Sequence, residues 1–337
     1  MSVIAFKKIC GVLTVNKPVE MTSRQAVTEV EWHTRRLARE HGQKIRRATV
    51  KVGHAGTLDP LATGVLVVCV GKATQLVPWI QELPKTYRAE FTLGMRSNSD
   101  DIMGEVETVD NPPQPSRSEI EAALSRYQGT IEQVPPQFSA VHVDGKRAYA
   151  LARRGEEVKL DARPVEIYDI EILDYNWPEL TLNVVCGSGT YIRAIARDLG
   201  NDLGCGALMH GLARTAVGPF TLEDAIEIPH IKEQNWLPDL QPARVAVKHL
   251  PTYECSPSEE DWLINGRIIE AVGTGAWREG DIEIPVANSD GRLVCIATKK
   301  QKTGEQLQLK PRLVFKPTLY ADSLEKTTPL PESQSSL

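Results

Sequence analysis

Residues 53–66 display a single short carboxylate on a loop that glycines punctuate. Gly56 and Gly64 permit backbone angles and close approaches that a side chain would forbid. Pro60 disfavours helical angles at Asp59 and directs that residue toward an extended or turn conformation. A carboxylate on a rigid loop can serve as a nucleophile or a base, although an aspartate before a proline is also ordinary turn chemistry.

The complete string around Asp59 is more specific than the aspartate alone, because it resembles the catalytic segment of the TruB-type tRNA pseudouridine synthases. Further motifs resemble the same family in the same order over about 200 residues, which is a far more specific pattern than one short motif. They are Gly11–Pro18 with Met21–Ser23, Lys85–Tyr87, Leu93–Gly104, Pro135–Ala140 with Gly145–Tyr149, Cys186–Arg193 and Asp198–Ala207.

The resemblance implies an enzyme that isomerises uridine to pseudouridine in tRNA, at the T-loop position conventionally numbered 55, without a guide RNA. Asp59 is then the nucleophile, and its target stays open between the ribose C1′ and the uracil C6. The reaction breaks the N1 glycosidic bond, rotates the uracil and rejoins it through C5, with no net oxidation or group transfer. We therefore expect no cofactor and no metal, and the sequence has no Walker loop, dinucleotide fingerprint or metal-ligand cluster.

The same resemblance assigns roles to residues around the aspartate. It pairs Arg193 with the Asp59 carboxylate and stacks Tyr87 on the target base, where the phenol could relay the C5 proton. It makes Leu212 an apolar wall of the uracil pocket and leaves Tyr191 to line the pocket or to orient the aspartate. Each has an ordinary alternative, such as a surface arginine, a strand aromatic or a core leucine.

Contacts with RNA are expected from side chains near the loop. The resemblance places His54 against the RNA, in the space that the flipped-out base vacates. Lys17 and Lys85 are candidates for phosphate contact or for holding the loops. Residues 97–99 read Ser-Asn-Ser where the family usually has Thr-Asp-Thr, so any role of that missing acid is lost here.

The net charge of −5 disfavours a nucleic-acid partner at first sight, but the charges are segregated along the chain. Residues 33–51 contain seven Lys or Arg and one acid, whereas residues 254–283 contain eight acids and two arginines. Arg46, Arg47 and Lys51 belong to the basic run, in a link that is longer than the family's usual one. They form either a basic arm that contacts RNA or a solvated face.

With 337 residues, of which 25% are charged and 41% hydrophobic, the chain can build a catalytic domain and a smaller second one. No apolar run approaches the ~20 residues that cross a bilayer, and the first residues lack the core of a signal peptide. The six scattered cysteines form no C-x-x-C pair and are expected to be reduced thiols. We expect a cytoplasmic monomer that acts on the T-arm of tRNA and needs no membrane and no obligate protein partner.

The elements that must position these residues follow from hydrophobic periodicity. Strands and helices do not alternate strictly, which predicts an α+β fold, and the resemblance implies the mixed, mainly antiparallel central sheet of pseudouridine synthases. Strands are expected at residues 11–15, 65–70, 87–93, 165–173 and 180–185, and helices at 24–41, 118–127, 149–154 and 191–203.

The composition and the residue pattern of the sequence change after Ala225. Proline-containing connections are followed, from Thr252 onward, by short β-like runs with a hairpin signal at residues 288–291. We predict a catalytic domain over residues 1–250, a small β-barrel module of the RNA-binding PUA type over 251–316 and a disordered tail over 317–337.

Two other classes of function stay open. One is a tRNA-folding chaperone or RNA-binding module with secondary or no catalysis, against which the intact Asp59, Tyr87 and Arg193 argue. The other is an RNA-guided synthase of the dyskerin type, which would carry basic extensions where this chain has an acidic C-terminal region. A hydrolase with paired carboxylates would need a second well-placed acid, which the motifs do not supply.

Overall fold

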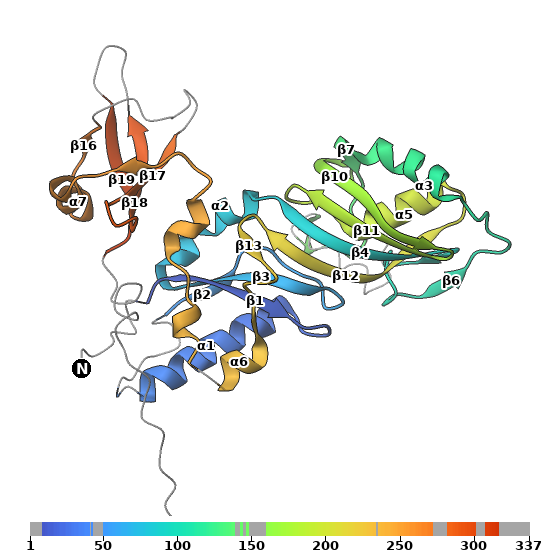
Figure 1. Ribbon diagram of the computed structural model, residues 1–337, viewed down its shortest axis with the longest axis horizontal. Coiled ribbons are helices and arrows are strands. Elements are labelled where there is room, and N and C mark those ends of the chain that lie inside the picture. Colours follow the sequence, from blue (N-terminus) through green and yellow to red (C-terminus); the bar gives the residue numbers. More distant parts are fainter. Residues whose placement is uncertain are drawn as a thin grey trace, which may run out of the picture.

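A computed structural model describes residues 9–40, 42, 50–138, 160–233, 235–271, 282–300 and 307–316, and the backbone of a paired β8 (His142–Val143) and β9 (Lys146–Arg147). Its largest feature is a sheet with the strand order β14-β1-β3-β12-β4-β11-β10-β7 (Figure 1). Its pairings are antiparallel, except those of β1 with β14 and of β3 with β12. The strands are β1 (Gly11–Lys17), β3 (Thr63–Val70), β4 (Lys85–Leu93), β7 (Gly129–Gln133), β10 (Arg163–Asn176), β11 (Glu179–Cys186), β12 (Ala207–Val217) and β14 (Ile226–Glu227), with β2 (Val52–His54) and β13 (Phe220–Thr221) at the margins.

The first helix shows how the sequence sets an element's boundary. Thr22 caps it, because the Thr22 Oγ1 accepts from the Gln25 backbone N at 3.1 Å and the Gln25 Oε1 accepts from the Thr22 N at 2.7 Å. Its apolar stripe, which includes Ala26, Val27 and Val30, is fully buried against the sheet. The helices are α1 (Ser23–Glu40), α2 (Val77–Glu82), α3 (Arg117–Leu124), α5 (Ile192–Asp202), α6 (Ile228–Glu233) and α7 (Pro257–Ile264), with the 3-10 turns η2 (Gly71–Leu76), η3 (Ser125–Tyr127), η4 (Leu237–Asp239) and η5 (Ala243–Val247).

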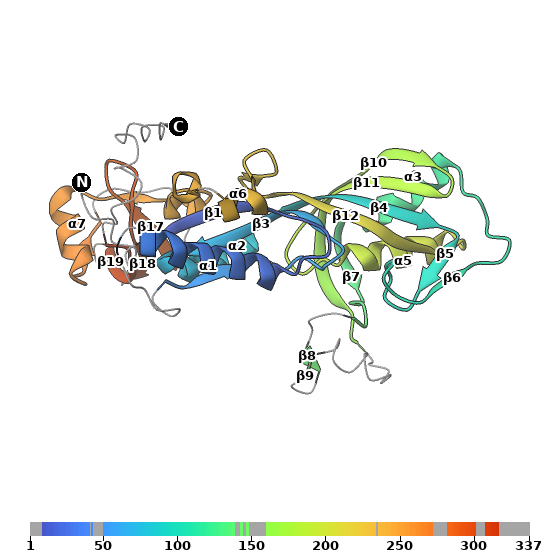
Figure 2. The ribbon, with the colours of Figure 1, turned by 90° about the horizontal axis from the view of Figure 1, so that it is seen from below.

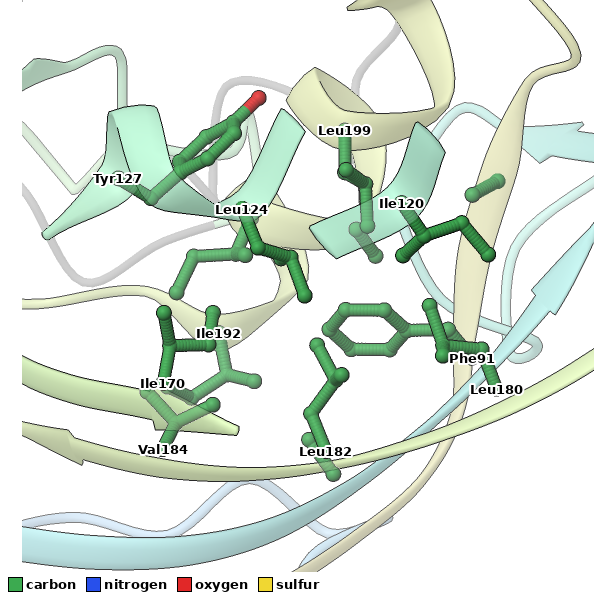
Figure 3. Close-up of a cluster of buried hydrophobic side chains, with 14 of the residues drawn as sticks. Phe91, Ile120, Leu124, Tyr127, Ile170, Leu180, Leu182, Val184, Ile192 and Leu199 are labelled. Carbon is green, nitrogen blue, oxygen red and sulfur yellow. The ribbon is translucent and has the colours of Figure 1, made fainter. Parts of the chain in front are cut away.

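The core on one face of the sheet is divided into two clusters. In one, α3 and α5 lie over β4, β10 and β11, and Ile120 and Leu199 point toward Phe91 (Figure 3). In the other, α1 and α6 lie over β1 and β3. Tyr87 and Leu212 pack against both clusters, so these two residues mark the seam between them.

A second, curled five-stranded sheet lies with α7 at one end of the molecule (Figures 1 and 2). It shares a core with the large sheet, since Leu293, Ile296 and Phe315 are buried in one cluster with Trp79 and Phe220. Its strand order is β15-β17-β18-β19-β16, with β15 (Tyr253–Glu254), β16 (Ile269–Glu270), β17 (Glu283–Ala287), β18 (Leu293–Lys300) and β19 (Gln308–Val314); a separate pair joins β5 (Met95–Ser97) and β6 (Val106–Thr108).

These elements confirm the predicted α+β fold and its mixed, mainly antiparallel sheet. Every predicted strand of the large sheet is present, and the 288–291 turn closes a hairpin between β17 and β18, where the Asn288 N donates to the Arg292 O at 3.0 Å. Among the elements that the sequence analysis missed are β7, β12, α2, α6 and α7. The predicted helix 149–154 and the predicted tail 317–337 lie outside the described residues.

Candidate active site

The loop that carries Asp59 connects β2 to β3 and is fixed from α1. The Ser23 Oγ accepts from the Leu58 N at 2.9 Å and donates to the Leu58 O at 3.0 Å, in a buried position. A tight turn follows, in which the Ala62 N donates to the Asp59 O at 3.1 Å. The backbone on both sides of the Asp59 carboxylate is therefore held in one conformation.

Arg214 on β12 also fixes the loop that carries Asp59. Its side chain is only 2% exposed, and it donates to the Val65 O at 2.8 Å, the Gly56 O at 3.1 Å and the Thr57 O at 3.5 Å. Gly64 makes this approach possible, because its φ is +95° and a Cβ there would lie 2.2 Å from the Arg214 O. Gly64 is thus required by packing against a strand that lies far along the chain.

Lys17 and Lys85 donate to backbone carbonyls and do not present an ammonium group to solvent. Lys17 is fully buried, and its Nζ donates to the Met21 O at 2.7 Å, the Pro18 O at 2.8 Å and the Pro60 O at 3.5 Å. Lys85 is also buried and donates to the Gln81 O. Burial lowers the pKa of each lysine to about 8. Of the two roles considered for these lysines, this geometry favours holding the loops over contacting phosphate for Lys17, whereas Lys85 is bonded to the end of α2.

Arg193 joins Asp59 to a second carboxylate. The Arg193 Nη2 lies 3.0 Å from the Asp59 Oδ2, and its Nη1 lies 3.2 Å from the Asp101 Oδ2. The arginine side chain is 6% exposed and the Asp101 side chain 9%, whereas that of Asp59 is 43% exposed. The guanidinium is further held by the Ser99 O at 3.1 Å and the Phe138 O at 3.2 Å. One carboxylate of the network is therefore accessible to a substrate and the other is internal.

Asp101 is a member of this site that the sequence analysis did not single out. Its Oδ1 accepts from the Ser99 Oγ at 2.7 Å and from the Met103 N at 3.0 Å, so the carboxylate is fully engaged. The residue lies in the 93–104 motif, which was the available signal. The sequence alone did not indicate which of the adjacent Asp100 and Asp101 faces the arginine.

Asp100 forms a neighbouring ion pair, with its Oδ2 3.0 Å from the Arg197 Nη1, one helical turn beyond Arg193. Arg197 also pairs with Asp198 at 2.8 Å and donates to the Val134 O at 2.9 Å. Burial raises the pKa of Asp100 to about 6, against the opposing effect of Arg197. The loop that carries Asp101 is thus anchored twice on α5.

Tyr87 and Leu212 are placed where an apolar pocket wall would be needed. Tyr87 is paired in register with Arg214 of β12. Leu212 lies on the same strand, two residues before Arg214. Burial raises the pKa of the Tyr87 phenol, so the phenol stays protonated at neutral pH. Tyr191 lies at the start of α5, where its N donates to the Gln133 Oε1 at 2.8 Å, and its side chain is half-buried.

The residues predicted to touch RNA are spread more widely. His54 ends β2 and is half-buried; burial lowers the pKa of its imidazole, which favours the neutral form. Its Nδ1 is buried and has no hydrogen-bond partner among the described residues. Lys51 is exposed at the start of β2, whereas Arg46 and Arg47 lie outside the described residues.

Other site types find little support in the described part of the chain. The six cysteines are all free thiols, and five of them are buried. Within the described ranges, no three His, Cys, Asp or Glu side chains are arranged to hold a metal ion. Over the same ranges, no helix has the length and apolar character that crossing a membrane demands.

Two family models match the chain in succession. The model of the TruB family pseudouridylate synthase N-terminal domain matches residues 43–192, and that of the tRNA pseudouridylate synthase B C-terminal domain matches residues 193–248. A tRNA pseudouridine synthase B of Synechococcus sp. strain CC9311 is 40% identical over 318 residues, which cover 90% of this chain and 97% of that protein. One of Phocaeicola vulgatus is 46% identical over 226 residues, which cover 67% and 92%.

The fold has solved relatives as well. The structure of a Cbf5-Nop10-Gar1 complex superposes with a TM-score of 0.68 at 24% identity, over 94% of this chain and 87% of that one. At this identity the match shows the fold alone, and it agrees with the predicted pseudouridine synthase sheet. The sequence relatives, the two family models and this fold lead to one conclusion: the chain belongs to the TruB family of pseudouridylate synthases.

Proposed function

We propose that this enzyme converts the T-loop uridine of tRNA, conventionally position 55, into pseudouridine, with Asp59 as its nucleophile and without a guide RNA. The observation that carries the proposal is the Asp59 carboxylate, 43% exposed on a fixed loop and paired at 3.0 Å with the buried Arg193. The names of the relatives, tRNA pseudouridine synthase B, support tRNA as the substrate.

The geometry suits covalent catalysis by a carboxylate. Arg193 pairs with the Asp59 carboxylate and fixes one of its oxygens at 3.0 Å, which leaves the other oxygen free to attack. The attack at the ribose C1′ or at the uracil C6 detaches or activates the base without any group being transferred to solvent. The buried Asp101 balances the charge of Arg193. The guanidinium can therefore stay buried while Asp59 forms and breaks its covalent bond to the nucleotide.

Holding the uracil while it rotates is the second requirement. Tyr87 and Leu212 lie side by side at the seam of the two core clusters and offer an aromatic face and an apolar wall. We assign stacking to Tyr87, because the raised pKa keeps its phenol protonated and a protonated phenol is a poor acceptor for the C5 proton.

A half-buried, neutral His54 near the loop suits contact with the RNA that surrounds an extruded base. We further propose that residues 1–250 carry the catalysis and that the C-terminal module over 251–316 adds affinity for tRNA. Its curled sheet supports this assignment, which follows the position of the PUA-type domain in the resemblance.

The proposal can be tested with the purified protein and an unmodified tRNA transcript, with no other RNA or protein present. Pseudouridine should form at the T-loop uridine and nowhere else, as mapped by base-specific chemical labelling and primer extension. A transcript with that uridine changed to cytidine is the matched control. Formation only after addition of a guide RNA, or at another position, would contradict the proposal.

A further inference from the structure

We propose that the outward face of α1 is an RNA-binding track that holds the tRNA substrate at a distance from the reacting uridine, an inference that rests on the proposed function. The track is defined by Arg24, Thr28, Trp32, Arg35 and Arg39. At 3.6 residues per turn, these five side chains fall within about 80° of arc around the helix axis. The face opposite to them is the buried apolar stripe of α1.

Trp32 is the aromatic element of the track. It is 52% exposed, although a tryptophan on a helix usually contributes its large surface to a core. Its ring meets the ring of the buried His33 at a centroid distance of 4.5 Å and an interplanar angle of 71°. This edge contact fixes the indole at one side and leaves its surface available. An exposed, oriented aromatic side chain is the type of group on which unpaired bases stack.

The arginines of the track are largely available for phosphates. Arg39 is exposed and forms no ion pair with any residue that the structure describes. Arg35 donates only its Nε, to the Glu31 O at 3.2 Å, within that same part of the chain. Arg24 is 60% exposed and has one pair with Glu31 at 3.4 Å, which is a weak, solvent-screened contact.

Arg36 lies on the same helix as the track but is not part of it. It belongs to the same basic run, but it lies on the flank next to α6, outside the arc of the track, where it donates to the Lys232 O and pairs with Glu40 at 3.5 Å. Glu29 faces that flank as well, 3.4 Å from the Lys232 Nζ. Glu29 and Glu40 thus lie toward α6, outside the arc of the track, whereas Glu31 borders the track and pairs with Arg24.

Continuity with the catalytic loop indicates what occupies the track. Ser23, the first residue of α1, is bonded to Leu58, which is the neighbour of Asp59. With a rise of 1.5 Å per residue, Trp32 lies about 14 Å and Arg39 about 24 Å along the helix from Ser23. A polyanion whose uridine lies at Asp59 can therefore continue along the arginines, whose charge complements its phosphates. The occupant that fits is the substrate RNA, and a protein partner is the alternative.

The test uses the full-length protein with Trp32→Ala and, separately, Arg35→Gln with Arg39→Gln. Tyr168→Ala on β10 (53% exposed) and Arg117→Gln on α3 (52% exposed) are controls of matched exposure on other elements of the proposed catalytic domain. The Kd for tRNA and the single-turnover rate at saturating protein are measured at several salt concentrations. Circular dichroism and thermal unfolding verify that each variant is folded.

We expect Trp32→Ala to weaken tRNA binding by at least about fivefold. The arginine pair should reduce the slope of log affinity against log salt by about 1 to 2. The rate at saturation should stay within about twofold of the unchanged protein, and the controls should alter neither quantity.

Unchanged Kd values in both track variants would overturn the inference and return the face to a solvated surface or to a protein partner. A loss of the saturating rate with an unchanged Kd would also overturn it, because the residues would then act on the chemistry. Failure of the proposed function is a separate result, in which the unchanged protein forms no pseudouridine although the comparison of tRNA affinities can still be made.

Discussion

At the scale of single residues, Arg193 connects groups that the sequence keeps far apart. A guanidinium that is 6% exposed carries a large desolvation cost, which two carboxylates and two backbone carbonyls offset here. Sequence resemblance could name Arg193 and Asp59. It could not name Asp101, because only folding decides which of two adjacent acids turns inward.

Replacing Arg193 with lysine should lower the rate of pseudouridine formation by about 100-fold, although the charge is kept. A point charge cannot bridge Asp59 and Asp101 as the planar fork does, and a small misplacement of a nucleophile costs about that factor. Arg197→Lys, one turn later on the same helix, is the control and should cost much less. Equal single-turnover rates for the two variants would mean that the bridge does not matter.

We predict that Asp100 makes the single-turnover rate depend on pH. Its carboxyl has a pKa of about 6 and is charged above that pH, where it pairs with Arg197 at 3.0 Å. As the pH falls through about 6, this carboxyl gains a proton and the loop that carries Asp101 loses one anchor. We expect the single-turnover rate to fall in that window. Asp100→Asn should be slower above pH 6 and lack this step, and a profile identical to that of the unchanged protein would refute the role.

At the scale of elements, the loop that carries Asp59 is fixed by β12, a strand that the sequence analysis missed. The strand is irregular, with register shifts between Met209 and Gly211 and between Arg214 and Ala216. Such bulges interrupt the alternation of apolar and polar residues that reveals a strand. Helices such as α1 and α5 were predictable, since their apolar periodicity is unbroken.

Gly64→Ala tests this dependence on β12. A Cβ at Gly64 would lie 2.2 Å from the Arg214 O, so the loop or the strand must move. Gly129 is the matched control, because its φ of +90° resembles the +95° of Gly64 but nothing lies within 4 Å of a Cβ there. Gly129→Ala should cost about 1 to 2 kcal/mol of unfolding free energy from backbone strain alone. Gly64→Ala should cost clearly more in urea unfolding and abolish most of the rate, and similar costs would contradict the packing argument.

At the scale of the whole molecule, the two sheets are joined by a common core. The composition change near Ala225 and the β-like runs after Thr252 were visible in the sequence. The burial of Phe315 with Trp79 was not, because packing between distant segments leaves no local pattern. The proposed boundary at residues 250 and 251 therefore separates two sheets that share apolar contacts.

Phe315→Ala should destabilise the whole protein by about 3 to 5 kcal/mol, as for other buried phenylalanines. The shared core predicts a single unfolding transition in urea, monitored by tryptophan fluorescence and by circular dichroism, that shifts as a unit. Leu222→Ala, at a side chain that is 37% exposed, should change stability by no more than about 0.5 kcal/mol. Two transitions, of which only one moves, would show that the C-terminal sheet folds independently.

The most direct test of the account is the single-turnover rate of Asp59→Asn on an unmodified tRNA transcript, measured beside its Kd for the same RNA. The amide keeps the shape of the side chain but cannot form the bond that a carboxylate nucleophile forms. We predict no detectable pseudouridine, with a Kd within about tenfold of the unchanged protein, or about 1.4 kcal/mol. A residual rate above a few per cent, in a folded variant that binds tRNA, would contradict the assignment of Asp59 as the nucleophile.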